Sequence, residues 1–308
     1  MVMMGQVVVT GNHGLIGHCV GQMLAESGYS VVGVARRAEP GHAGAATVGI
    51  DLAAPDALRS LELLGPVAAV VHCAASLPAS FFSPLSDVVA EKNRAMDQAV
   101  FEFCRRRGAR LIYCSGTSIY AQLGRQPARV GDPLYSDDGY LREKIWAEQE
   151  IRDTLDSFVI LRICAPYGPR QSSRTVLRTF IERALRGEDI LFYGSGTREQ
   201  DFIHAQDVAL AVKAALVHDD VNDTFNISGG SPIRMRDLGA MVIKVLGRRG
   251  ISARAAGQPD PQEGCYARFD LSPAQALLGW KPSIPLVTGI AEMAAHMAEG
   301  MDATRANL

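Results

Sequence analysis

Residues 6–17 read QVVVTGNHGLIG, a short apolar run that leads directly into three closely spaced glycines. A run of this length, rich in β-branched valine, is typical of a buried strand. Gly11 permits a tight turn, Gly14 lets a pyrophosphate approach the backbone, and Gly17 allows a helix to pack closely on the strand. A helical stretch follows, and its first N–H groups are unpaired donors suited to phosphate. The stretch predicts a dinucleotide-binding unit with the following contact residues: Gly11, His13, Gly14, Leu15, Ile16 and Gly17.

The remainder of the first half alternates in the same way. Apolar runs recur at Ser30–Ala35, Thr47–Ile50, Ala68–His72, Arg110–Ser115 and Phe158–Ile163. Helical patterns occupy Asp87–Arg107 and Tyr140–Asp153. Strands alternating with helices predict an α/β fold, a doubly wound parallel (Rossmann) sheet with helices on both faces.

The second half is less regular. Helices are expected at Thr175–Arg186 and Met235–Leu246, separated by turns that contain glycine and proline. We expect a dinucleotide-binding domain over residues 1–165 with a return segment near 201–227. We expect residues 166–308 to form a small C-terminal substrate-binding lobe over the carboxyl ends of the strands.

Composition excludes several classes of protein. The chain has 308 residues, with 31 Lys and Arg against 33 Asp and Glu, so we expect neither nucleic acid nor a membrane surface as partner. No apolar run reaches the ~20 residues needed to span a bilayer, and the N-terminus lacks the features of a signal peptide. The six cysteines show no C-x-x-C pair, which predicts no disulfide framework and no metal site. We therefore expect a cytoplasmic protein with reduced thiols.

The residues at the end of the second predicted strand bear on the choice between NAD and NADP. NAD-binding proteins usually place an acid there to hold the ribose hydroxyls, whereas this chain continues Ala35-Arg36-Arg37. A guanidinium can pair with a 2′-phosphate through its planar fork of donors. The sequence therefore favours NADP over NAD. Asp51 and the following Leu52 come just after the third strand, where they can meet the adenine ring.

A tyrosine and a lysine lie four residues apart in a predicted helix. Tyr140 and Lys144 therefore share one helix face. A nearby ammonium stabilises a phenolate and lowers the pKa of the tyrosine, which suits proton exchange with an alcohol or a ketone. The pair lies between the fifth and sixth predicted strands, and it is the predicted catalytic centre.

Together these segments resemble the extended short-chain dehydrogenases, the NAD-dependent epimerase/dehydratase family. Cys73-Ala74-Ala75 is similar to the family's fourth-strand motif that lines the cofactor, and Asn93 is similar to its helix asparagine. The resemblance continues through residues 161–170, 201–208, 225–227 and 278–280. It implies a tightly held nicotinamide cofactor, Tyr140 as proton donor or acceptor, and Lys144 on the ribose. It also implies a small-molecule substrate, often a nucleotide sugar, and a homodimer.

The chain departs from the family pattern at the fifth strand. Gly116 stands where the family usually has a catalytic Ser or Thr, so Thr117 or Ser115 must supply the hydroxyl. Freedom of φ at a glycine could turn Thr117 into the site. Dehydratases carry Asp and Glu where this chain has Thr117 and Ser118, so sugar dehydration is not expected.

The expected substrate contacts also depart from the family. Ala165 stands where the family often has asparagine, and Gln200 stands where it often has arginine, with Arg198 close by. Cys73, Cys114 and Cys164 each end one of three neighbouring predicted strands. We interpret these three as small packing residues, with a thiol-lined pocket or a soft-metal site as the alternative.

The sequence thus predicts an NADP(H)-dependent oxidoreductase that interconverts a ketone and a secondary alcohol on a nucleotide sugar or a related polyol. Two alternatives stay open. One is a nucleotide-sugar epimerase with a retained cofactor. The other is a cofactor-binding protein with weakened catalysis, because Gly116 lacks the hydroxyl.

Overall fold

A seven-stranded parallel sheet forms the centre of the computed structural model, which describes residues 5–38, 46–77 and 86–306, with side chains through residue 300. The strand order is β11-β6-β5-β4-β1-β2-β3. The strands are β1 (Val7–Thr10), β2 (Val31–Ala35), β3 (Ala46–Gly49), β4 (Ala69–His72), β5 (Arg110–Gly116), β6 (Phe158–Ile163) and β11 (Asp223–Ile227). The order reverses between β1 and β4, which is where open sheets of this type bind ligands. The predicted Rossmann fold is confirmed, with each predicted strand boundary within one residue of the observed one.

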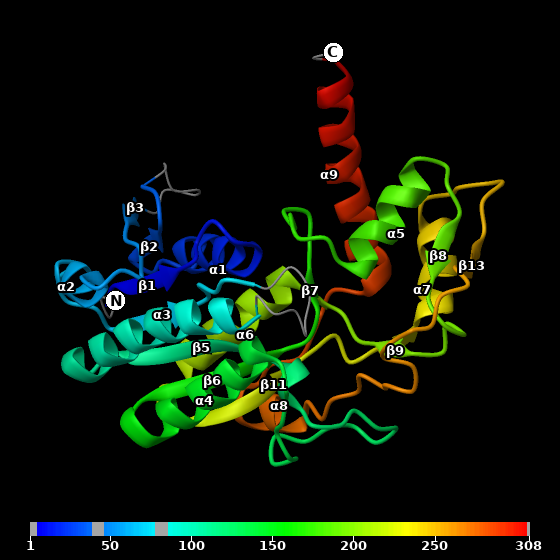
Figure 1. Cartoon of the computed structure of the whole chain (residues 1–308). Coiled ribbons are helices and arrows are strands. Elements are labelled where there is room, and N and C mark those ends of the chain that lie inside the picture. Colours follow the sequence, from blue (N-terminus) through cyan, green and yellow to red (C-terminus); the bar gives the residue numbers. More distant parts are fainter. Residues whose placement is uncertain (1–4, 39–45, 78–85, 307–308) are drawn as a thin grey trace.

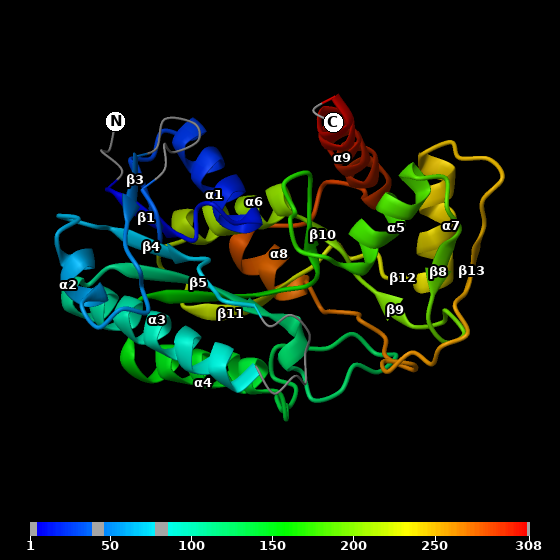
Figure 2. The same ribbon diagram turned by 45° about the horizontal axis from the view of Figure 1, so that its top comes forward.

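Helices cover both faces of the sheet (Figures 1 and 2). On one face α1 (Leu15–Glu26) and α6 (Ala205–Val217) bury apolar side chains, while α2 (Ala57–Glu62), α3 (Ser86–Arg107) and α4 (Gly139–Thr154) cover the other. Strands buried on both faces explain the continuous apolar runs in the sequence. Within the described residues, no helix is long and apolar enough to cross a bilayer.

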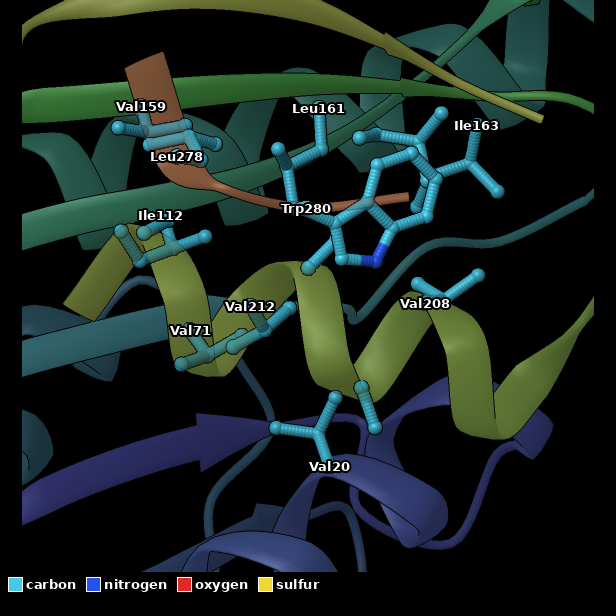
Figure 3. Close-up of a cluster of buried hydrophobic side chains, with 14 of the residues drawn as sticks. Val20, Val71, Ile112, Val159, Leu161, Ile163, Val208, Val212, Leu278 and Trp280 are labelled. Atoms are coloured by element: carbon cyan, nitrogen blue, oxygen red, sulfur yellow. The ribbon is translucent and has the colours of Figure 1, made fainter. Parts of the chain in front are cut away.

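Two segments from the second half of the chain complete this part of the fold: one is the edge strand β11, and the other covers a face of the sheet. β11 pairs with β6 in parallel. After α8 (Ser272–Leu278), Trp280 inserts between the sheet and α6, as Figure 3 shows. Its side chain is 4% exposed, and its indole N–H donates to the carbonyl oxygen of Asp207 at 3.0 Å.

A second, smaller group of elements packs around its own apolar core (Figure 1). It comprises α5 (Val176–Leu185), α7 (Met235–Val245), α9 (Leu286–Ala306) and the parallel pair β8 (Ile190–Phe192) and β13 (Ala253–Ala255). Two short pairings connect it to the sheet: β7 (Pro166–Tyr167) with β10 (Ile203–His204), and β9 (Glu199–Gln200) with β12 (Ile233–Arg234).

Candidate active site

The glycine loop after β1 has the conformation that its sequence predicts. Gly11 has φ +65°, and a Cβ added there would lie 2.8 Å from the Cα of Ala74. A Cβ on Gly17 would lie 2.3 Å from the carbonyl oxygen of Gly11. Gly14 is the N-cap of α1 and offers no side chain to the first N–H groups of the helix. Glycine is therefore required at position 11 for the contact with the segment after β4, and at position 17 for the close packing of α1 on the loop.

An open pocket of about 850 Å³ lies beside this loop, at the carboxyl ends of the strands. It includes ten of the predicted contacts: Gly11, His13, Gly14, Arg36, Arg37, Asp51, Leu52, Cys73, Ala74 and Ala75. Further lining residues that the sequence did not single out are Val34, Ile50, Ser76, Lys92, Met96 and Ser172. Ser172 lies between β7 and α5, so the chain of the smaller lobe reaches this edge of the sheet.

The two arginines after β2 face this pocket. Arg36 and Arg37 are both exposed, and among the residues that the structure describes neither guanidinium has an ion-pair partner. Asp51 lines the same end, and its carboxylate accepts the N–H of Ala53 at 3.1 Å. This end of the pocket thus offers two cations and one acid to a ligand.

The predicted cofactor contact Asn93 lies behind the pocket rather than in it. Its side chain is 1% exposed and makes two hydrogen bonds to Ser76. The amide oxygen accepts the Ser76 N–H at 2.8 Å, and the amide group donates to the Ser76 carbonyl at 2.9 Å. Asn93 therefore fixes the backbone that follows Ala74 and Ala75. Leu15, Ile16 and Gly17 lie in the first turn of α1, next to the lining residue Gly14.

Tyr140 and Lys144 lie one turn apart near the start of α4, as predicted. Asp138 caps the helix by accepting the N–H of Leu141 at 3.1 Å. The hydroxyl of Ser86, at the start of α3, accepts the Tyr140 N–H at 3.0 Å and donates to Asp138 at 2.8 Å. These bonds hold the start of α4 against α3 and set the position of the phenol.

Charges around Tyr140 act in opposite directions. Burial raises the pKa of Tyr140, Lys144 lowers it, and Asp97 and Asp138 raise it further, so its pKa lies above the usual value. Burial lowers the pKa of Lys144, but Asp97, Tyr140, Cys114 and Glu143 outweigh that effect and the net pKa is raised. Lys144 thus lowers the pKa of Tyr140 as the sequence predicts, but burial and the two carboxylates outweigh it, so the net direction is opposite to the one expected.

Lys144 is held by two residues that the sequence reasoning missed. Its ammonium donates to the hydroxyl of Tyr113 at 2.6 Å, and Tyr113 in turn donates to Asp97 at 2.7 Å. All three side chains are buried, with exposures of 3% or less. Burial raises the pKa of Asp97, but Lys144, His72 and Tyr113 outweigh it and lower the pKa below its usual value. Asp97 is thus the buried counter-ion of Lys144.

The same hydrogen-bond chain continues to the wall of the pocket. His72 bonds to Asp97 through Nε2 at 2.8 Å and to the hydroxyl of Thr10 through Nδ1 at 2.7 Å. Thr10 also accepts the N–H of Ala74 at 3.1 Å. The partners are all satisfied when the Nε2–H donates to Asp97 and the hydroxyl of Thr10 donates to Nδ1. The chain therefore connects the β4 end, which lines the pocket, with the lysine of α4.

There is space for a side chain at Gly116, where the expected hydroxyl is missing. The hydroxyls of its two neighbours, Ser115 and Thr117, are both hydrogen-bonded to other residues. A Cβ on Gly116 would meet only the carbonyl oxygen of Ile163, at 3.8 Å. Ser115 donates to Glu148 at 2.7 Å, and Thr117 hydrogen-bonds the thiol of Cys164. Gly116 has φ −139°, an extended backbone that any residue adopts. The turn into η2 (Thr117–Ile119) therefore does not depend on a glycine, contrary to the expectation from the sequence.

The acceptor of the Ser115 hydroxyl belongs to a buried ion pair. Glu148 and Arg162 are both nearly inaccessible, and a guanidinium nitrogen lies 2.7 Å from the carboxylate. Arg162 also donates to the hydroxyl of Tyr120 at 3.0 Å. This network joins α4 to β6 directly beneath the end of β5.

The three predicted substrate contacts lie where β6 leads into the smaller lobe. Ala165 has φ +36°, and it is the one non-glycine residue with positive φ in the described ranges. Arg198 forms an ion pair with Asp260 at 2.8 Å, and its guanidinium also reaches Gln200 at 3.5 Å. Gln200 donates to the carbonyl oxygen of Asp201 at 3.2 Å. Two of the three side chains are therefore already hydrogen-bonded within the lobe.

Comparison with known proteins identifies the family. The sequence profile of the NAD dependent epimerase/dehydratase family matches residues 7–228. The chain belongs to this family.

Two curated relatives extend over most of the chain. A protein named putative GDP-L-fucose synthase 2, from Oryza sativa subsp. japonica, is 26% identical over 308 residues, or 94% of this chain and 85% of the relative. A dTDP-4-dehydro-6-deoxy-D-allose reductase from Streptomyces bikiniensis is 26% identical over 319 residues, or 94% of each chain.

Solved structures of the family superpose on the whole fold. MoeE5, solved in complex with UDP-glucose and NAD, has a TM-score of 0.82 and 27% identity, and the alignment covers 96% of this chain and all of that one. The UDP-glucose 4-epimerase of Thermotoga maritima has a TM-score of 0.82 at 22% identity, over 96% of this chain and 99% of that one. This chain is therefore an enzyme of the extended short-chain dehydrogenase/reductase class.

The family motifs explain why the sequence identified Tyr140 and Lys144 but missed Asp97 and Tyr113. Tyr113 lies inside an apolar strand run, and Asp97 lies on the face of α3 that also carries Val100 and Phe101 into the core. The only sign of these two residues in the sequence was a polar side chain inside an otherwise apolar pattern.

Proposed function

We propose that this enzyme is an NADP(H)-dependent oxidoreductase that interconverts a ketone and a secondary alcohol on a nucleotide sugar. The observation that carries the proposal is the pair Tyr140 and Lys144 on α4, with the ammonium of Lys144 donating to the hydroxyl of Tyr113, which in turn donates to Asp97. A protonated phenol suits proton donation to a ketone oxygen, which is the reducing direction.

The glycine loop and the pocket suit a dinucleotide. Gly11 and Gly17 let the loop and α1 pack closely, and the first N–H groups of α1, which no side chain caps, are the donors that we assign to a pyrophosphate. Arg36 and Arg37 are the residues we assign to a 2′-phosphate, because both guanidiniums line the pocket. Asp51 and Leu52 lie at the adenine end, and the segment from Cys73 to Ala75 continues along the pocket wall.

The chain's own groups carry the proton. A bound nicotinamide supplies or accepts the hydride. Tyr140 donates its proton to the substrate oxygen during reduction and takes it back during oxidation. Lys144 stabilises the phenolate that forms, and it positions the ribose. Tyr113 and Asp97 hold Lys144 in place, so they are positioning residues rather than catalytic ones.

The substrate oxygen needs a second donor, and we assign it to Thr117. The proton of Ser115 is directed to the carboxylate of Glu148, a charge-assisted bond inside a buried ion pair. The partner of Thr117 is a thiol, a weaker hydrogen-bonding group that a substrate oxygen can replace more easily. We place the substrate at Ala165, Arg198 and Gln200, between the sheet edge and the smaller lobe.

The test is turnover with nucleoside-diphosphate 4-keto sugars, followed by the absorbance of the reduced cofactor. We expect NADPH to be consumed faster than NADH, with one alcohol product per cofactor. Equal use of both cofactors would remove the NADP preference, and no consumption with any keto sugar would remove the reductase assignment.

Epimerisation with a retained cofactor is the second candidate. A putative UDP-glucose 4-epimerase from Methanocaldococcus jannaschii is 27% identical over 304 residues, or 92% of this chain and 95% of the relative. An epimerase would purify with bound cofactor and interconvert two sugars without net consumption. A protein that binds the cofactor but catalyses neither reduction nor epimerisation would fit the remaining alternative, in which catalysis is weakened because Gly116 lacks a hydroxyl.

A further inference from the structure

Two cysteines from neighbouring strands lie together at the edge of the cofactor pocket. Cys73 follows β4 and Cys114 lies in β5, and the register pairs His72 with Tyr113, so the next residues on each strand are opposite each other. Their sulfur atoms are 3.5 Å apart and hydrogen-bonded. Cys73 lines the pocket, and both residues are partly exposed. The proposed hydride transfer uses neither thiol.

The backbone geometry at this pair suits a disulfide. Adjacent strands are about 4.8 Å apart, which lies within the Cα separation of 4.4–6.8 Å that disulfides span. The sulfur atoms need to approach by roughly 1.5 Å to reach the bond length of about 2.05 Å.

The pair is distinct from the other cysteines and from a metal site. Cys164, which the sequence placed at the same sheet edge, donates instead to the carbonyl oxygen of Asp201 at 3.3 Å. Among the described residues, no group of three or more His, Cys, Asp or Glu side chains could hold a metal ion. A soft metal therefore has only two thiols here, whereas a disulfide needs no third group.

Two contacts bear on the reactivity of this pair. The hydrogen bond to Cys114, together with burial, raises the pKa of Cys73 well above its usual value. Either sulfur can donate the hydrogen bond that joins the two thiols. The ammonium of Lys144 interacts electrostatically with both sulfurs, and a nearby cation favours a thiolate.

We propose that Cys73 and Cys114 are an oxidation site that forms a reversible disulfide with a peroxide in the cofactor-free enzyme. One thiol of the pair loses its proton, and its thiolate attacks one oxygen of hydrogen peroxide. The O–O bond breaks, a sulfenic acid forms, and the departing hydroxide takes up the released proton as water. The second sulfur then attacks the sulfenic sulfur, the S–O bond breaks, and the departing hydroxide takes the proton of the second thiol as water. In total, two thiols and one hydrogen peroxide give one disulfide and two waters.

The position of the pair links oxidation to cofactor binding. Cys73 forms part of the wall that the dinucleotide would cover, and Cys114 lies directly beside it. A bound dinucleotide therefore shields the thiols from peroxide, and a disulfide alters the wall that the dinucleotide contacts. Oxidised enzyme is expected to bind NADP at least tenfold more weakly than reduced enzyme, and a dithiol reductant is expected to restore binding.

The test begins with wild-type enzyme stripped of nucleotide and treated with hydrogen peroxide. Free thiols are then blocked with N-ethylmaleimide, and the protein is digested without reduction. Mass spectrometry is expected to find a peptide that links Cys73 to Cys114, and to lose it after treatment with dithiothreitol. Cys73→Ala and Cys114→Ala are each expected to abolish the link, while Cys164→Ala and Cys104→Ala, the matched controls, retain it.

The outcomes separate this proposal from the proposed function. A link through any other cysteine, or irreversible sulfinic acid at Cys114 with no link, would overturn the disulfide. Protection by NADP tests the further claim, which rests on the proposed cofactor site, and its failure alongside a confirmed link would count against that site and not against the oxidation chemistry.

Discussion

The two sides of Tyr140 are built in contrasting ways. On the lysine side, Lys144, Tyr113 and Asp97 form a buried chain of short hydrogen bonds that reaches the pocket wall through His72. On the hydroxyl side, β5 ends in Gly116, where an added Cβ would meet only the carbonyl oxygen of Ile163 at 3.8 Å. The ammonium beside Tyr140 is thus held by buried partners, whereas in the proposed mechanism the second contact to the substrate oxygen depends on the hydroxyl of Thr117.

Removing the phenol proton is expected to produce the largest effect. Tyr140→Phe keeps the packed ring, so we expect kcat to fall roughly 10²- to 10⁴-fold while NADP affinity stays within about twofold. Steady-state rates beside cofactor titrations measure both. Tyr135→Phe is the matched control, because Tyr135 is 63% exposed just before α4. Activity of Tyr140→Phe within a few-fold of the wild type would remove Tyr140 from the mechanism.

The hydroxyl side is tested by moving the donor. Thr117→Val keeps the shape and deletes the hydroxyl, and we expect kcat to fall on the order of a hundredfold. Ser115→Ala is expected to lower stability by about 1 kcal/mol, because Glu148 loses a partner, with a smaller loss of kcat.

A variant that restores a hydroxyl at position 116 provides a second test of the Thr117 assignment. A side chain at Gly116 meets only ordinary contacts, so Gly116→Ser in the Thr117→Val background is expected to recover at least tenfold in kcat. If Ser115→Ala loses more turnover than Thr117→Val, the assignment of the hydroxyl is wrong.

A substitution at the proposed adenine end of the pocket is expected to leave the surroundings of Tyr140 unchanged. Arg36→Ala is expected to weaken NADP binding about ten- to hundredfold and NAD binding far less, because a lost charged hydrogen bond is worth roughly 1.5–3 kcal/mol. Calorimetry with each cofactor measures the difference, and Arg59→Ala on α2 is the control. Equal weakening of both cofactors would mean that Arg36 does not contact the 2′-phosphate.

Replacing Asp97, the counter-ion of Lys144, is expected to give the smallest effect. The effect should be seen mainly in the dependence of kcat on pH. Asp97 raises the pKa of Tyr140, so Asp97→Asn is expected to lower it. In the reducing direction Tyr140 must be protonated, so the alkaline limb of the kcat profile should move to lower pH. The exposed Glu91 on the same helix provides the control variant Glu91→Gln. A lower melting temperature with an unmoved pH profile would leave Asp97 with a structural role only.

Local patterns predicted most of the sheet, and they also supplied the glycine loop and the Tyr140–Lys144 pair of the candidate site. The glycine loop and the Tyr140–Lys144 pair are short-range patterns, since each depends on residues within one turn of a helix or one loop. The buried network is different, because Asp97 and Tyr113 lie on separate elements that meet only in the folded chain. The proposed division at residue 165, the site residues and the cofactor preference remain predictions.

The departure at Gly116 also could not be resolved from the sequence. Which neighbouring hydroxyl is available depends on partners contributed by other elements, Glu148 on α4 and Cys164 after β6. The backbone at Gly116 proved extended, so the glycine signalled a missing side chain rather than a special turn.

The place of Trp280 has a consequence for the order in which the protein can fold during synthesis. The indole fills the layer between the sheet and α6, although it lies more than a hundred residues after β6. A ribosome that has released only the first six strands presents a sheet whose face is still open to water. The nucleotide-binding half therefore cannot complete its core until nearly the whole chain has emerged. Chaperones that shield apolar surface would act on this enzyme late in translation rather than early.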